Sequence, residues 1–388
     1  MKIKSLGMGN VRSCLPLLCI ATPLLAPLSC VNAAVQLPEV LVTPSRIEQR
    51  QTEGLSLGTI VRRRFFRHKA AVASMIVMLL ITLLAFTSVG VVIGGSGQLV
   101  TDPNTGRLAI DGLRIPGWWQ YNWYENYPIM NAGGTPTLSI WPFNIGEHPF
   151  GQDTLGKDIF ARVMRGIQQS LTVIFLVGLI ATVLGVLVGS IAGFLRGKID
   201  SLLMRFTDVI IIIPTLVLGA VLGRTFGGNA ISLGILLGLI AWTGLARLVR
   251  AEFLSLRERE FVDAARVAGA PSRWIIFRHI LPNSIGVIVV NSTLLMSAAI
   301  LIETSLSYLG FGIVAPDISL GQIISEYNEA FKTRPWLFWY PGLFIVMIAL
   351  AINFIGDGLR DAFDPRQRRL PKTDGALNDL KRILKGRK

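Results

Sequence analysis

The sequence predicts an all-α, polytopic membrane protein with six transmembrane helices and with both its N- and C-terminal ends in the cytoplasm. Of its 388 residues, 51% are hydrophobic and only 16% are charged, and the mean hydropathy is +0.54. These values lie outside the range typical of soluble globular domains. Basic residues gather in short stretches beside apolar runs, which is the pattern of cytoplasmic loops.

Six apolar runs are each long enough to cross the roughly 30 Å hydrocarbon core of a bilayer as a helix. We expect these spans at residues 70–93, 170–194, 206–226, 230–250, 284–313 and 338–357. Since successive spans alternate in direction, basic stretches at alternate ends identify the cytoplasmic side. The cations that identify it are Arg62, Arg63, Arg64, Arg67 and Lys69, then Arg196, Lys198 and Arg205, then seven arginines from Arg247 to Arg278, and finally Arg366, Arg368 and Arg369.

The net charge of +14 is explained by these loops. Basic residues that sit beside apolar spans are placed there by membrane topology and do not form a continuous basic surface. Membrane lipid is therefore an expected partner, and nucleic acid is not.

Residues 1–55 differ from the rest of the chain. Residues 1–34 combine Lys2 and Lys4 with an apolar stretch and a small residue at Ala33, as in a secretory signal peptide. Residues 37–51, LPEVLVTPSRIEQRQ, resemble the energy-coupling box of TonB-dependent outer-membrane receptors, although no barrel of alternating strands follows. A cleaved signal peptide would place the basic flank of the first span outside, whereas all later loops place it in the cytoplasm. We interpret residues 1–55 as an atypical extension, with a cleaved segment, a fusion and a misassigned start as the alternatives.

The remainder divides into four parts by composition. These are a cytoplasmic basic segment with the first span at 56–94, a polar periplasmic segment at 95–169, a core of five spans at 170–357 that contains a charged loop at 253–283, and a basic cytoplasmic tail at 358–388. The periplasmic segment holds six clustered aromatic residues, which predict an interfacial belt or the core of a small external cap, with a ligand platform as the alternative. They are Trp118, Trp119, Tyr121, Trp123, Tyr124 and Tyr127.

Glycines recur at helical spacing within two of the spans. Small residues in such a row allow helix backbones to approach closely in lipid, so these faces are expected to pack inside the bundle or against a partner. The rows are Gly178, Gly185, Gly189 and Gly193 in the second span, and Gly234 and Gly238 in the fourth.

The charged loop at 253–283 is predicted to form two short helices in water, because charged groups and open backbone are too costly in hydrocarbon. The first helix covers residues 256–268, and Gly269 ends it in the left-handed conformation. Pro271 then starts a second helix at 272–281. Phe261 and the alanines at 264, 265 and 268 give the first helix a small apolar face suited to docking in a cleft.

This loop resembles the cytoplasmic loop of permease subunits in ATP-binding-cassette importers, whose pattern is Glu-Ala-Ala, a spaced glycine, and then Ile-x-Leu-Pro. The chain keeps Ala264, Ala265, Gly269, Leu281 and Pro282 at that spacing and departs from it at Asp263 and His279. Further segments resemble the second permease of dipeptide and oligopeptide importers. They are HPFGQDTLGKD at 148–158, MRFTD at 204–208 with Pro214, and ETSLSYLGFG at 303–312.

The resemblance implies a type I importer permease fold, in which the loop is a coupling helix seated on a cytoplasmic ATPase. It also implies alternating access driven by two ATPase subunits that bind ATP and Mg, a second permease subunit, and a periplasmic binding protein, with no cofactor in this chain. The docking residues implied are Glu260, Phe261, Asp263, Ala264, Ala265, Ala268, Gly269, Leu281 and Pro282.

Glu303 lies well inside the fifth apolar run, where an ionisable group is costly and is a functional candidate for that reason. With Thr304 and Ser307 it is a candidate for the translocation pathway, and the alternative is a hydrogen bond between helices.

No catalytic or metal-binding residues are predicted. The sequence has no G-x-x-x-x-G-K-[ST] loop, and its three histidines and three cysteines form no metal-ligand pattern. An intramembrane hydrolase would need paired catalytic groups, which are lacking. The alternatives to a peptide importer are a nickel or other small-solute importer of the same family, and a membrane receptor or signalling module.

Overall fold

A computed structural model describes residues 57–93, 99–101, 108–110, 113–139, 144–226 and 228–363. The segment that resembles a signal peptide with a TonB-type box lies outside these residues, as does the basic tail beyond Phe363.

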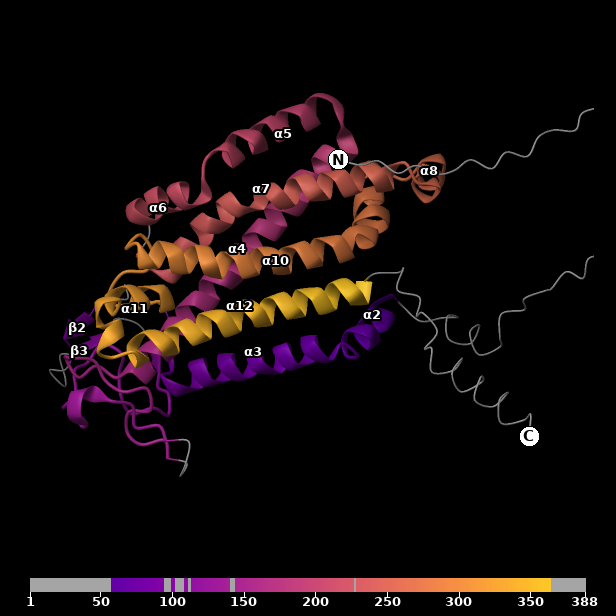
Figure 1. Cartoon of the computed structure of the whole chain (residues 1–388). Coiled ribbons are helices and arrows are strands. Elements are labelled where there is room, and N and C mark those ends of the chain that lie inside the picture. The colour runs from indigo at the N-terminus through magenta and orange to yellow at the C-terminus, as the bar shows by residue number, and fades with distance from the viewer. Residues whose placement is uncertain are drawn as a thin grey trace, which may run out of the picture. The chain divides into compact units, whose positions relative to one another are not determined.

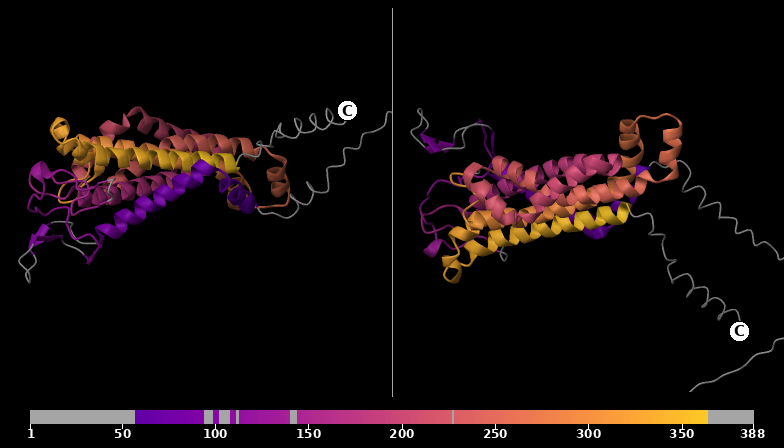
Figure 2. Two further views of the ribbon diagram at one scale, coloured as in Figure 1. Left: turned by 60° about the horizontal axis from the view of Figure 1, so that its bottom comes forward. Right: turned by 90° about the horizontal axis from the view of Figure 1, so that it is seen from above.

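Five long helices lie side by side (Figure 1). They are α3 (Lys69–Ser88), α4 (Ile159–Leu195), α7 (Ala230–Arg257), α10 (Leu281–Tyr308) and α12 (Trp336–Phe363). The short helix α8 (Glu260–Val267) projects beyond one end of this bundle, and α11 (Leu320–Glu326) lies at the other end (Figures 1 and 2). We call these the α8 end and the α11 end.

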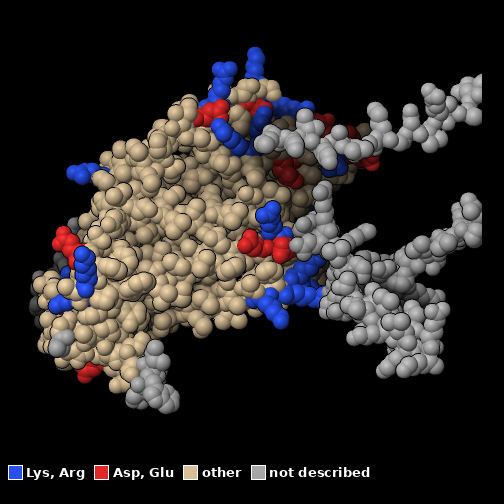
Figure 3. Space-filling view, viewed as in Figure 1, with Lys and Arg blue, Asp and Glu red and all other residues tan. Residues whose placement is uncertain are grey.

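The bundle has the length and polarity of a membrane domain. Five helical segments of the described chain are long and apolar enough to cross a bilayer, or up to six if the bent pair α5 (Gly197–Ile212) and α6 (Thr215–Phe226) forms one span. On the face shown in Figure 3, charged side chains gather at the two ends, and a broad uncharged band separates them.

The third expected span is broken rather than straight. Its two halves, α5 and α6, meet at an angle of 83°. Ile213 between them is extended, with φ −79° and ψ 123°. Pro214 follows, and because a proline disfavours the helical conformation of the preceding residue, the helix stops at Ile212.

The glycine rows lie inside the bundle, as predicted. Gly178 faces Met296 of α10, and the other five glycines lie where α4 and α7 pack against each other. A Cβ on Gly189 would lie 2.8 Å from Cβ of Val249, and a Cβ on Gly238 would lie 2.8 Å from Cβ of Ile180. Real Cβ atoms do not approach so closely, so the two backbones are held together at a distance that only glycine permits.

The α11 end carries a cap whose short strands the all-α prediction did not include. Two antiparallel pairs of three-residue strands lie there, β1 (Val91–Ile93) with β4 (Leu113–Ile115) and β2 (Leu99–Thr101) with β3 (Leu108–Ile110). Helix α4 begins at Ile159, well before the expected position near residue 170. The polar segment therefore leads directly into a long helix.

At the α8 end, α2 (Leu57–Phe65) packs on the last turns of α12. Phe65 of α2, Ala71 of α3 and Ala362 of α12 form the small apolar cluster where these three helices meet. His68 caps α3 by accepting a hydrogen bond from Ala71 N at 3.1 Å, and its Nε2 lies 3.4 Å from Asp361.

The contact between α4 and α7 can be tested with a pair of glycine variants. We expect Gly189→Val to lower stability by about 1–3 kcal/mol or to prevent folding, because overpacking forces the helices apart. Gly244→Val on α7 is the control, since a Cβ there meets no atom within 4 Å. Thermal unfolding of the purified protein in detergent measures both. Equal melting temperatures for the two variants would contradict the close contact.

Candidate coupling loop and translocation site

The charged loop folds into the helix, turn and helix that the sequence predicts, with different boundaries. Helix α7 runs on to Arg257, Arg259 is extended, and α8 begins at Glu260. The expected single helix over 256–268 is therefore two helices, because the chain turns at Glu258 and Arg259 after leaving the bundle.

Gly269 ends α8 in the predicted left-handed conformation, with φ +78°. The N–H of Ala270 donates to the carbonyl of Ala265 at 3.0 Å, which closes the helix end. A Cβ on Gly269 would meet nothing within 4 Å, so only the backbone angle requires glycine here.

The second helix does not end at Pro282, contrary to the prediction. Helix α9 (Ser272–Trp274) passes into the π-helical segment η2 (Ile275–Ile280), which continues directly as α10 from Leu281. Pro282 is the second residue of α10 and follows directly on the π-helical segment, where the regular hydrogen-bond ladder is already altered. The loop is thus joined to the span without a flexible link.

Helix α8 is anchored by a residue that the sequence analysis did not single out. Val262 is fully buried and packs in a cluster with Phe253, Ile275 and Ile280. Ala265 also faces this cluster. The sequence does carry a signal for this anchor: Val262 and Ala265 are three residues apart and so lie on one face of the helix.

The opposite side of α8 is open. Phe261, Ala264 and Ala268 are exposed as expected, together with Glu260, Asp263, Gly269 and Pro282, and Leu281 is half-buried. Val267, Trp274 and Phe277 were not predicted, yet their exposed fractions are 90%, 54% and 62%. Large apolar side chains left in the open beside a charged helix form a surface suited to a protein partner.

Glu303 is fully buried between α10 and α4. Its carboxylate accepts hydrogen bonds from the hydroxyls of Ser170 at 2.9 Å and Ser307 at 2.8 Å. Thr304 is covered by α11, where a Cβ on Gly321 would lie 2.8 Å from Thr304 Cα. The bond from Ser170 of α4 is the hydrogen bond between helices given as the alternative, whereas Ser307 lies on the same helix as Glu303. The pathway role of the three residues stays a prediction.

A cavity of about 260 Å³ lies at the break between α5 and α6. Ile210, Ile211 and Thr215 line it from the broken span, and Thr243 of α7 and Ala298 of α10 line it from the bundle. The sequence analysis did not place a site here. The proline at 214 is the signal that could have suggested one.

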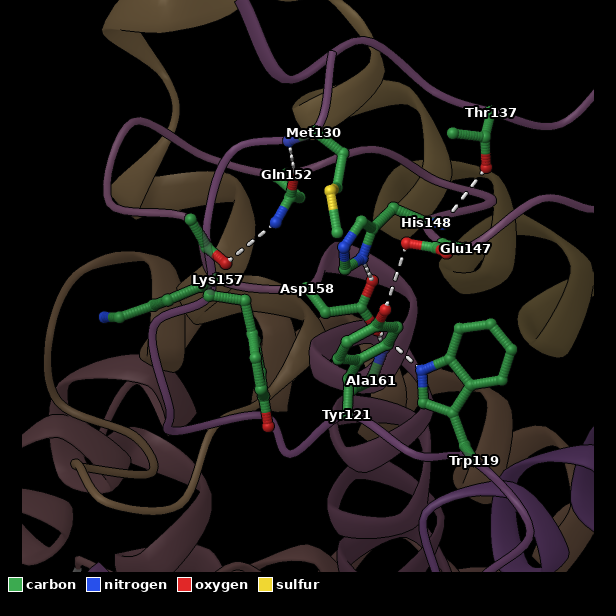
Figure 4. Close-up of polar contacts among 12 residues, drawn as sticks. Trp119, Tyr121, Met130, Thr137, Glu147, His148, Gln152, Lys157, Asp158 and Ala161 are labelled. Carbon is green, nitrogen blue, oxygen red and sulfur yellow. Dashed lines mark hydrogen bonds and ion pairs between the residues drawn. The ribbon is translucent and has the colours of Figure 1, made fainter.

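The HPFGQDTLGKD segment forms the buried centre of the cap (Figure 4). His148, Trp119 and the backbone of Ala161 converge on Asp158, at 2.8, 2.8 and 2.9 Å. Asp158 therefore caps the N-terminus of α4 and holds the cap to it. The amide of Gln152 accepts from Met130 N and donates to the carbonyls of Pro128 and Gly156.

The start of α4 is also joined to the α11 region by ion pairs. Arg162 pairs with Glu326, and Arg165 pairs with Asp317 at 2.6 Å. Tyr327 donates to Asp153 at 2.9 Å. Burial, together with the charges of Asp153 and Glu326, raises the pKa of Tyr327, which keeps the phenol protonated as a donor.

The aromatic residues of the cap serve mainly as its core. Trp123 is 3% exposed, and Trp119 lies with its ring centroid 4.5 Å from that of Phe160. Trp118 is 60% exposed at the edge of the cap. Within the described residues, no group of three His, Cys, Asp or Glu side chains is placed to hold a metal ion.

Known proteins share these features. Residues 185–369 match the family "Binding-protein-dependent transport system inner membrane component", and residues 56–100 match "N-terminal TM domain of oligopeptide transport permease C". Both matches begin after residue 55, so the resemblance of the first 55 residues to a signal peptide and a TonB-dependent receptor is unsupported.

Similar curated proteins include the oligopeptide transport system permease protein OppC of Haemophilus influenzae, which is 36% identical over 83% of this chain and 93% of its own length. OppC of Escherichia coli is 36% identical over 83% and 95%. A putative peptide permease protein of Brucella ovis is 41% identical over 66% and 82%.

A solved structure of the inward-facing MetNI methionine ABC transporter gives a TM-score of 0.44 at 20% identity, over 52% of this chain and 95% of that one. By the identity and coverage of its curated relatives, the chain belongs to the inner-membrane permease components of binding-protein-dependent ABC importers, in the oligopeptide permease C branch, and it is a multi-pass permease subunit rather than an enzyme.

Proposed function

We propose that this chain is the second-permease-type subunit of an ATP-driven importer that moves oligopeptides across the inner membrane by alternating access. The observation that carries the proposal is α8, a short helix that ends at the left-handed Gly269, projects beyond the bundle and is joined by short turns to α7 and to the helix that leads into α10. The relatives named above as oligopeptide permeases support a peptide substrate over nickel.

The exposed side of α8 is the proposed docking surface for an ATPase subunit. It joins Phe261, Ala264, Ala268 and Val267 to the neighbouring Trp274. Small side chains let a partner approach the helix backbone, and the flanking large ones supply the apolar area that protein interfaces bury. Two such ATPases bind ATP and Mg in this proposal, and this chain holds no cofactor.

The α8 end faces the cytoplasm in this proposal. Exposed arginines at 62, 63, 64 and 67 lie at this end of the bundle, in α2 and just after it. The positive-inside rule places such a basic flank in the cytoplasm. The cap then lies in the periplasm, where a substrate-binding protein delivers the peptide. A second permease subunit completes the translocation pathway.

Reconstitution tests the function directly. The chain is co-expressed with a partner permease, ATPase subunits and a binding protein from the same organism, and the complex is placed in vesicles. We expect ATP-dependent uptake of labelled tri-alanine that requires the binding protein. Uptake of nickel without uptake of any peptide, or no assembly with an ATPase, would contradict the proposal.

Substitutions of Gly269 test whether the turn is needed for docking of the ATPase. We expect Gly269→Val to weaken ATPase co-purification and uptake strongly, because the left-handed backbone costs a β-branched residue at least about 1–2 kcal/mol. Gly269→Asn is the matched control, since asparagine tolerates this conformation. The bundle should melt normally in both variants. Wild-type ATPase association in the valine variant would oppose the proposed role.

Substitutions of Glu303 test whether its hydrogen bonds stabilise the packing of the helices. Glu303→Ala leaves the hydroxyls of Ser170 and Ser307 without their acceptor, so we expect it to lower stability by about 1–3 kcal/mol. Glu303→Gln keeps an acceptor oxygen and should assemble and transport within about twofold of wild type. Normal assembly of the glutamine variant with uptake abolished would instead indicate the pathway role.

A further inference from the structure

Helix α5 is held to the bundle by few buried side chains. Of its residues, Gly197–Ile212, only Thr207 is buried. The apolar side chains of Leu202, Val209 and Ile212 are 70%, 62% and 79% exposed. Ordinary apolar packing within this chain therefore does little to fix where α5 lies.

Two ion pairs join α5 to α7 instead. The guanidinium of Arg250 donates two hydrogen bonds to the carboxylate of Asp200, from Nε to Oδ1 at 2.5 Å and from Nη2 to Oδ2 at 2.7 Å. Arg247 pairs with Asp208. Because Arg247 and Arg250 are three residues apart on α7, both reach out from one face of that helix.

The first pair is the better shielded of the two. The side chain of Asp200 is 14% exposed and that of Arg250 is 32% exposed, whereas Arg247 and Asp208 are each about half exposed, at 48% and 53%. A two-armed contact of this kind fixes orientation as well as distance. A shielded charge that lost its partner would also be costly, so the pair resists separation.

One apolar contact continues the same line. Phe206 of α5 stacks on Trp242 of α7, with ring centroids 6.3 Å apart and planes at 24°. Ile210 packs against the small apolar cluster that contains Trp242 and Ala246 of α7. The line of contact thus runs from Asp200 at the α8 end to Ile210, next to the break at Pro214.

One end of this line of contacts lies near the loop that carries α8, and the other lies at the cavity beside Pro214. Helix α7 leads through Arg257 into the loop that carries α8. Helix α5 leads through Ile213 and Pro214 to the cavity at the break, which Ile210 and Ile211 line. A displacement of α8 moves α7, and α5 follows only if the contacts between α5 and α7 hold.

We propose that Asp200, Asp208, Arg247 and Arg250 are positioning residues that make α5 move with α7, so that a displacement of α8 reaches the broken span and its cavity. This inference rests on the proposed transport function and adds the route within the chain. The ion pairs act as a clamp between a firmly packed helix and a loosely packed one, which gives rigid-body motion in place of slippage.

A charge exchange tests the clamp in the full complex in vesicles. We expect Asp200→Arg and Arg250→Asp each to lower tri-alanine uptake per ATP hydrolysed by about tenfold, and the double exchange to restore it to within about twofold, since the pair is remade with reversed sign. Lys198→Gln, an exposed charge on the same helix, is the control and should leave the ratio unchanged.

ATPase co-purification and melting temperature are measured for each variant, because a merely structural role would alter these and leave the ratio of uptake to hydrolysis unchanged. Wild-type ratios in both single variants would overturn the clamp. A double exchange that assembles and yet recovers nothing would overturn it as well.

A second measurement does not depend on the transported molecule. Spin labels are placed at Leu202 on α5, which is 70% exposed, and at Ser255 on α7, which is also exposed, after replacement of the native cysteines. We expect the same distance between them in nucleotide-free and vanadate-trapped wild-type complex, and a broadened distribution after Asp200→Ala with Asp208→Ala.

A third label at Leu80 on α3, 60% exposed, provides the reference. The distance from Leu202 to Leu80 should change on trapping while that from Leu202 to Ser255 does not. Equal changes in both distances would overturn the clamp. Failure of the wild type to import tri-alanine, with these distances behaving as expected, would overturn only the peptide function.

Discussion

The close approach of α4 to α7 is the contact on which the rest of the bundle depends. In lipid, apolar side chains gain nothing from mere burial, so helices associate through tight packing of small residues. The side chains of Leu245 and Val249 of α7 pack against Gly185 and Gly189 of α4, and that of Ile180 of α4 packs against Gly238 of α7. One helix of this pair begins in the cap and the other ends at the loop that carries α8. The two ends of the molecule are thereby joined by a stiff pair of helices.

The broken span α5–α6 is bound in a contrasting way. Its apolar side chains are largely exposed, and its firmest contacts within the chain are charged. An element with little buried area is the one that moves most easily when the bundle changes state. The cavity at Pro214 lies between this movable element and the helices α7 and α10. Firmly and loosely packed parts of one chain are thus placed side by side, which the proposed alternating-access function requires.

Polar groups at the α11 end show how the chain meets the cost of burying charge. Asp158 has three hydrogen-bond donors, and Arg165 is paired with Asp317. Glu303, deeper in the bundle, is held by two serines from different helices. Buried charges persist when they are paired or hydrogen-bonded. The contacts of Arg165 with Asp317 and of Ser170 with Glu303 also tie α4 to other parts of the chain.

The local pattern of the sequence was enough to determine the helical membrane class, the close-packing glycines and the turn at Gly269, because apolar run length, helical spacing and backbone sterics act over neighbouring residues. Tertiary structure alone decided that α4 begins at Ile159, that Val262 turns inward while Val267 stays exposed, and that Pro282 lies inside a continuous helix. It also decided the partners of Glu303 and Asp200. Ser170 and Arg250 are far from them in sequence, and only the packing of whole helices brings such pairs together.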